Sequence, residues 1–131
     1  MNTLEFLKRV LPIEGFYVTT VINQDGRKQG FFESVEELAQ TCERLDSTGN
    51  NTYFAISSFN AKGNRKQDNV RATKVVAIDV DCGEGKPYPS WKEGLQELGK
   101  FVNTMRLPKP MIIYSGNGLH VYWVLTEQLE P

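Results

Sequence analysis

The stretch PMIIYSGNGLHVYWVL, residues 110–125, decides the fold of the C-terminal half of this chain. It holds two apolar segments, residues 110–115 and 119–125, rich in the β-branched and aromatic side chains typical of strands. A Gly-Asn-Gly turn joins them, so the stretch predicts a β-hairpin. Successive side chains of a strand point to opposite faces. His120 and Tyr122 are therefore predicted on the face opposite the expected core positions Leu119, Val121, Trp123 and Leu125.

A second strand is predicted upstream, in KVVAIDVD at residues 74–81. The same alternation places Asp79 and Asp81 on one face, and the buried face is expected to hold Val76, Ile78 and Val80. Two neighbouring carboxylates repel each other unless a cation lies between them. Carboxylate oxygens are preferred ligands of Mg²⁺ and Mn²⁺. The pair thus predicts a divalent metal site, and a merely solvated strand face is the alternative.

The remaining pattern predicts a mixed α/β (α+β) fold. Its largely antiparallel sheet would have helices packed on one face, all within a single domain, residues 1–131. An apolar face along residues 95–105 is expected to be core. The expected helices cover residues 3–10, 35–45 and 90–105, and further strands cover residues 16–22, 28–32 and 52–58.

Composition narrows the classes of function. The chain is 40% apolar and 24% charged, with a net charge of −1, so any nucleic-acid surface must be a local basic patch. His120 is the one histidine, which excludes zinc sites and replication-initiator sites built on paired histidines. Cys42 and Cys82 show no metal-ligand spacing and predict reduced thiols. No segment approaches the roughly 20 apolar residues of a membrane span, so a cytoplasmic protein without membrane contact is expected.

The hairpin turn is a candidate anion site. Glycines let the backbone approach a ligand closely, and their N–H groups can converge on an anion. The candidate residues are Ser115, Gly116, Asn117, Gly118 and His120. A plain hairpin turn beside a polar histidine is the alternative.

Together, Asp79-Val-Asp81 and Ser115-Gly-Asn-Gly-Leu-His-Val-Tyr-Trp123 resemble two motifs of the archaeo-eukaryotic primase superfamily. The nearest branch is the primase-polymerase domains of phages, plasmids and mobile elements, and the resemblance covers roughly residues 52–131. It implies an RRM-like catalytic core that transfers nucleotides from NTP or dNTP onto a 3′-hydroxyl in DNA replication. By resemblance, Asp79 and Asp81 bind the catalytic metals, while Ser115 and His120 contact the phosphates of the incoming nucleotide.

Two departures from the family pattern stand out. No later acid matches the family's third metal-binding motif, so the chain is expected to be the N-terminal part of a catalytic domain. The turn also lacks the lysine that some relatives carry there. Basic residues of the loop 60–73 are expected to supply the missing charge, with Arg65, Lys66 and Arg71 on triphosphate or template, or else to be solvated.

The resemblance also implies partners: nucleoside triphosphates, a single-stranded DNA template, and a replicative helicase domain or protein. Three other functions stay open at this point. They are a nucleotide- or DNA-binding fragment without catalysis, a metal-dependent nuclease using the same carboxylates, and a purely structural domain.

Overall fold

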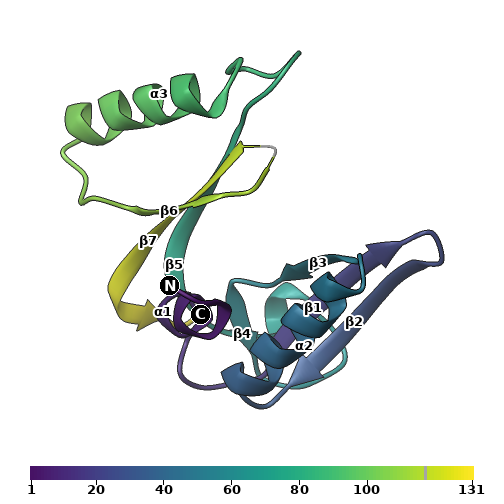
Figure 1. Cartoon of the computed structure of the whole chain (residues 1–131). Helices are drawn as coiled ribbons and strands as arrows, with labels where there is room; N and C mark the ends of the chain where they lie inside the picture. The colour runs from purple at the N-terminus through teal and green to yellow at the C-terminus, as the bar shows by residue number, and fades with distance from the viewer. Residues whose placement is uncertain (117) are drawn as a thin grey trace. The chain divides into compact units, whose positions relative to one another are not determined.

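The computed structural model in Figure 1 describes residues 1–116 and 118–131. It divides into two compact units, the first formed by residues 1–74 with 126–131 and the second by residues 75–125. Both contain helices packed with antiparallel strands, which confirms the predicted mixed α+β class. The expectation that residues 1–131 form a single domain stays a prediction.

The first unit contains a three-stranded sheet with the order β2-β1-β3. Strand β1 (Tyr17–Asn23) lies in the middle, antiparallel to both β2 (Gly26–Phe32) and β3 (Asn51–Phe54). Residues 17–21 are all buried, since β1 has a strand on each side and helix α2 (Val35–Ser47) packs against it. The centre of this unit is therefore β1.

Both N-terminal helices begin at side-chain caps. Helix α1 (Thr3–Val10) starts after Asn2, which forms a capping box with Glu5. Helix α2 starts after Ser34, whose hydroxyl accepts a hydrogen bond from the Glu37 amide at 3.2 Å. Each cap satisfies backbone donors that a helix start leaves without partners.

The strand expected over residues 52–58 is wrong, because the chain makes two short strands there. β3 pairs with β1, whereas β4 (Ser57–Phe59) pairs antiparallel with the beginning of β5 (Val70–Asp81). Ala55 still donates its amide hydrogen to the Val18 carbonyl, at 3.1 Å. The chain thus changes sheets within two residues, a change that side-chain alternation does not report.

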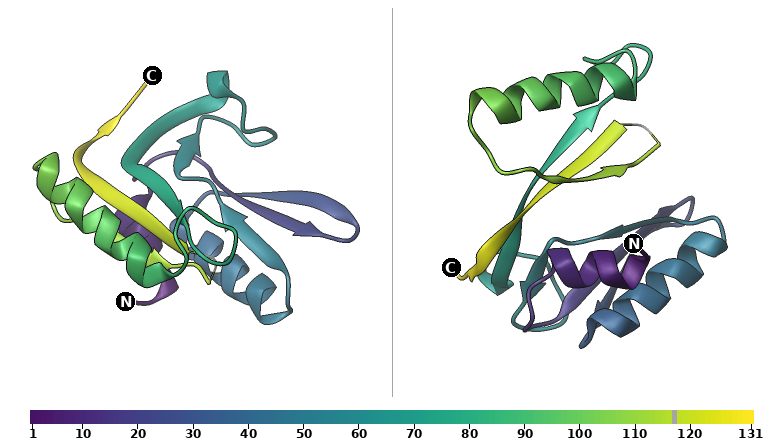
Figure 2. Two further views of the ribbon diagram at one scale, coloured as in Figure 1. Left: turned by 90° about the horizontal axis from the view of Figure 1, so that it is seen from above. Right: turned by 60° about the vertical axis from the view of Figure 1, so that its left-hand side comes forward.

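The second unit is built on three neighbouring strands, in the order β5-β7-β6. β6 (Met111–Tyr114) and β7 (Gly118–Leu129) form the predicted antiparallel hairpin. Helix α3 (Trp91–Thr104) covers one face of this hairpin, as both Figure 1 and Figure 2 show. Their shared core is formed by Leu98, Leu119 and Val121, against which half-buried side chains such as Val80 and Trp123 pack.

The predicted burial of one β5 face is largely wrong. Val80 packs against the core, but Val76 and Ile78 are 50% and 40% exposed. Phe101 on α3 and Met105, the residue after its end, are exposed as well, so the expectation that they belong to the core is wrong. Alternation determines which side chains share a face. It does not determine how much of that face a helix covers, and here Leu98 and the half-buried Val102 of α3 pack in the core whereas Phe101 does not.

None of the helices in residues 1–116 and 118–131 is long and apolar enough to cross a membrane.

Candidate functional site

Asp79 and Asp81 lie near the end of β5, and both side chains are exposed. They alternate with Val80, which packs against the helix-covered core. An aspartate is unfavourable within a strand unless its face is open to solvent or a ligand. The two carboxylates therefore stand on the side of β5 that is accessible to a ligand.

His120 is the side chain that the fold brings to Asp79. It lies on β7, the strand next to β5, and is paired across the hairpin with Ile113. Its Nε2 is 3.7 Å from Asp79 Oδ1, and both side chains remain substantially exposed. This distance is longer than a hydrogen bond but close enough for electrostatic attraction when the imidazole is protonated. Asp79 and His120 therefore lie next to each other on neighbouring strands of one sheet.

Tyr122 is next to His120 on the same face of β7 and is buried. Burial raises the pKa of its hydroxyl above the ordinary value, and the negative charge of Asp79 raises it further. A phenol is neutral around pH 7 even at the ordinary pKa, and the raised pKa keeps this O–H as a donor to higher pH. The buried Tyr122 ring thus packs beside the Asp79–His120 pair.

The turn between β6 and β7 is closed by the Ser115 amide, which donates to the Gly118 carbonyl at 2.9 Å. Ser115 and Gly116 are exposed, and Gly116 has a φ of 85°, a left-handed conformation that favours glycine. Asn117 lies outside the described residues. Ser115 and Gly116 are therefore accessible to a ligand, and their expected role in anion binding stays a prediction.

Gly118 has a different role from the one expected. A Cβ at this position would lie 2.1 Å from the Val80 carbonyl oxygen and 3.2 Å from the Cys82 amide nitrogen. Only a glycine lets β7 approach β5 this closely. Gly118 is buried in this contact, so it positions the Asp79 and His120 strands next to each other.

The predicted basic residues belong to the first unit, where two of them have protein partners. Arg71 donates to Glu14 at 2.5 Å, and this hydrogen bond raises the pKa of its guanidinium. Arg65 donates through Nε to the Gln29 amide oxygen at 2.8 Å, when that amide is oriented with its oxygen toward the arginine. Lys66 is exposed. Their expected role toward triphosphate or template stays a prediction.

The donor set around Asp79 suits a metal that is shared with a substrate. Among residues 1–116 and 118–131, no three His, Cys, Asp or Glu side chains form a group that could hold a metal. Mg²⁺ keeps several waters and is often bound by only one or two carboxylates together with substrate phosphates. The oxygens of Asp79 and Asp81 fit that arrangement and do not fit a cage made by protein alone.

Cys82 directly follows Asp81 and is buried. Burial raises the pKa of its thiol, and Asp81, Glu93 and Asp79 raise it further. Its Sγ also fills the space beside Gly94 on α3, where a Cβ would come within 2.7 Å. A protonated thiol is a poor metal ligand. Cys82 therefore serves as packing between β5 and α3.

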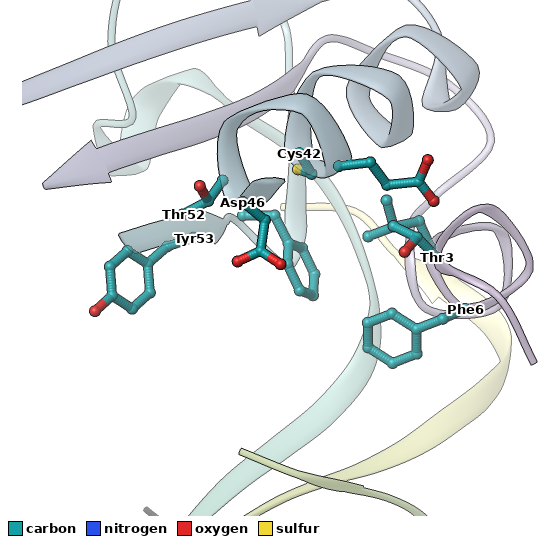
Figure 3. A pocket seen from close by; sticks show the side chains of 9 residues that line it. Thr3, Phe6, Cys42, Asp46, Thr52 and Tyr53 are labelled. Carbon is teal, nitrogen blue, oxygen red and sulfur yellow. The ribbon is translucent and has the colours of Figure 1, made fainter. Parts of the chain in front are cut away.

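The first unit has a cavity of its own, of about 190 Å³, between α1, α2 and β3. Figure 3 shows Thr3, Phe6, Cys42, Asp46, Thr52 and Tyr53 around it. Burial raises the pKa of the Cys42 thiol to about 11, with Asp46 and Glu43 adding to the shift. No residue singled out for chemistry by the sequence lines this cavity.

Comparison with known proteins gives no match to a family model, to a curated protein or to a solved structure.

Proposed function

We propose that the second unit carries part of a metal-dependent nucleotidyl-transfer site of primase-polymerase type. One observation carries this proposal: Asp79 and His120, distant in sequence, lie with Oδ1 and Nε2 3.7 Å apart on neighbouring strands. A carboxylate for metal and an imidazole for phosphate are then adjacent, as a nucleoside triphosphate bound through both would require. Asp81 lies two residues after Asp79, and Ser115 lies five residues before His120.

In the proposed reaction, the oxygen of a 3′-hydroxyl bonds to the α-phosphorus of a nucleoside triphosphate. The bond from that phosphorus to the bridging oxygen breaks, pyrophosphate leaves with the electron pair, and the hydroxyl proton passes to solvent. His120 donates a hydrogen bond to a phosphate oxygen, and the Ser115 hydroxyl can donate another. Asp79 attracts the protonated imidazole and so orients it toward the substrate. Bound Mg²⁺ or Mn²⁺ would neutralise phosphate charge and stabilise the attacking and leaving oxygens.

The proposed substrates and partners follow from this reaction. They are NTP or dNTP, a single-stranded DNA template and a primer end. In the cytoplasm, the protein would act together with a replicative helicase domain or protein. Arg65, Lys66 and Arg71 are proposed to hold phosphates. Arg71 would have to exchange its present partner Glu14 for a phosphate to do so.

A second candidate is a module that binds nucleotide without catalysing transfer. No third acid joins Asp79 and His120 within residues 1–116 and 118–131, so both candidates rest on the same side chains. Two carboxylates and one imidazole suffice to bind a metal–nucleotide complex, but a third acid would strengthen the metal site. Both candidates predict the same binding and differ only in catalysis.

Calorimetric titration with dNTP and Mn²⁺ tests the shared part of both candidates. The unmodified chain should bind, and Asp79→Asn with Asp81→Asn should weaken binding by about 10-fold or more, as loss of a single strong contact would. Asp25→Asn, on an exposed turn of the first unit, is the matched control and should bind normally. Equal affinity of all three proteins would end the proposal.

Activity assays then separate the candidates. Extension of a primed template with dNTP and Mn²⁺ identifies the transferase, and binding without extension identifies the binding module. Cleavage of labelled DNA with metal but without nucleotide would instead reveal a nuclease. If the chain neither binds nucleotide nor shows activity, it is a structural domain.

A further inference from the structure

Two exposed aromatic rings meet beside the hairpin turn of the second unit. Trp91 is the first residue of α3, and Tyr114 is the last residue of β6, directly before Ser115. Their ring centroids are 5.4 Å apart, with the planes at 83°. The side chains come from separate elements, so the fold itself creates this pair.

Both rings remain open to solvent. Trp91 is 46% exposed and Tyr114 is 57% exposed, although each is among the side chains that gain most from burial. The edge-to-face arrangement covers an edge of one ring and part of a face of the other. Flat ring surface is therefore left for a further planar group to stack on.

A cation accompanies the rings. Lys92 Nζ is 5.7 Å from the centre of the Trp91 ring. The patch thus combines flat apolar surface with a positive charge next to it. Nucleobases linked by phosphates present the complementary combination, since bases stack on aromatic rings and phosphates attract lysine.

The patch is distinct from the Asp79–His120 site. On β6 and β7, Ile112 and Val121 are paired and pack toward α3, and Tyr114 shares that face because it is two residues from Ile112. His120 points to the opposite face. The patch and the Asp79–His120 site therefore lie on opposite faces of the hairpin.

We propose that Trp91, Tyr114 and Lys92 form a stacking platform for single-stranded nucleic acid. The choice of nucleic acid as the partner rests on the proposed nucleotidyl transfer, whose template or primer strand needs a binding surface outside the metal site. Recognition by stacking would be largely independent of base sequence.

The chain offers a direct reporter for this platform. It contains two tryptophans, and Trp123 is held by a hydrogen bond from Nε1 to the Pro108 carbonyl at 2.9 Å. In a Trp123→Phe variant, the remaining tryptophan fluorescence comes from Trp91. Titration with a short oligothymidylate in EDTA should quench that fluorescence, because the base stacks on the ring. Unchanged fluorescence at saturating oligonucleotide would overturn the proposal.

Affinity measurements provide the second test. Anisotropy of labelled oligothymidylate should give a Kd about 10-fold higher for Trp91→Ala and for Tyr114→Ala than for the unmodified chain. Phe101→Ala is the matched control, because Phe101 is also an aromatic residue of α3 and is equally exposed, at 46%. It should leave Kd unchanged. Equal Kd for all variants, or an equal loss for Phe101→Ala, would refute the platform.

These results are separable from those on the metal site. EDTA removes any contribution of metal held by Asp79 and Asp81, so strand binding is measured alone. If the platform fails while dNTP binding still depends on those aspartates, only the platform is wrong. If strand binding succeeds and dNTP binding ignores the aspartates, the proposed transferase is wrong and the platform stands.

Discussion

His120 Nε2 lies 3.7 Å from Asp79 Oδ1, and the contact joins two strands that are far apart in the sequence. Gly118 makes this possible, because its missing side chain lets β7 lie directly against the Val80 carbonyl of β5. The glycine-rich turn thus has two parts with different roles. Ser115 and Gly116 are open to a ligand, and Gly118 holds the strands together.

Gly118→Ala should destabilise the protein strongly. The added Cβ would overlap the Val80 carbonyl, and overpacking of this kind costs about 3 kcal/mol of unfolding free energy. Gly99→Ala is the matched control, because a Cβ there meets open space within α3 and alanine favours helix, so it should stabilise by about 0.5–1 kcal/mol. Urea unfolding of both variants measures the difference. Similar stabilities would show that β7 does not approach β5 as described.

Leu119→Ala should cost much more stability than Val76→Ala. Leu119 is fully buried in the α3 core, where such a truncation removes about 2–5 kcal/mol. Val76 is half exposed, so its truncation should cost about 0.5 kcal/mol. Chemical denaturation measures both values. A large loss for Val76→Ala would mean that the apolar face of β5 is covered after all.

The Cys42 thiol should make stability fall at alkaline pH. Its folded pKa is about 11, against an ordinary value of 9.0. The unfolded chain therefore loses this proton first, and the unfolding free energy should decline as pH rises from 9 to about 11. Comparison of denaturation curves with those of Cys42→Ala isolates the effect. If the variant declines as steeply as the parent over that range, the assignment to Cys42 is wrong.

His120→Ala should weaken nucleotide binding at neutral pH. A hydrogen bond to a charged phosphate is worth about 1.5–3 kcal/mol, so Kd for dNTP with Mn²⁺ should rise at least about 10-fold. Thr126→Ala changes an exposed residue of the same strand and serves as the control. Calorimetry gives both constants. Equal constants would remove His120 from the proposed site.

Local sequence patterns predicted most helices and strands well, but they did not predict which faces of these elements are buried. The helix at residues 3–10 and the hairpin across residues 115–118 follow from periodicity and turn residues, and both are found. The strand at residues 52–58 fails because a switch between sheets leaves no mark on alternation. The burial of Val76 and Ile78 fails because the extent of α3 over the sheet depends on tertiary packing.

The candidate site was predictable where a single strand decides the face on which a side chain lies. Alternation placed Asp79 and His120 on exposed positions, and their proximity follows from β5 and β7 being neighbours. Trp91 was missed because it lies at a helix start, outside both motifs. Its meeting with Tyr114 is created by the fold and has no local signal.

Paramagnetic broadening by Mn²⁺ tests the central claim most directly. With dNTP present, substoichiometric Mn²⁺ should broaden the backbone amide signals of residues 79–82 and 118–121 in an NMR spectrum of the labelled chain. The signals of Asp25 and Asp46, exposed carboxylates of the first unit outside the basic loop, should stay sharp. Broadening centred on Asp79 and His120 would support the nucleotide and metal site. Broadening elsewhere, or broadening that persists in Asp79→Asn with Asp81→Asn, would contradict it.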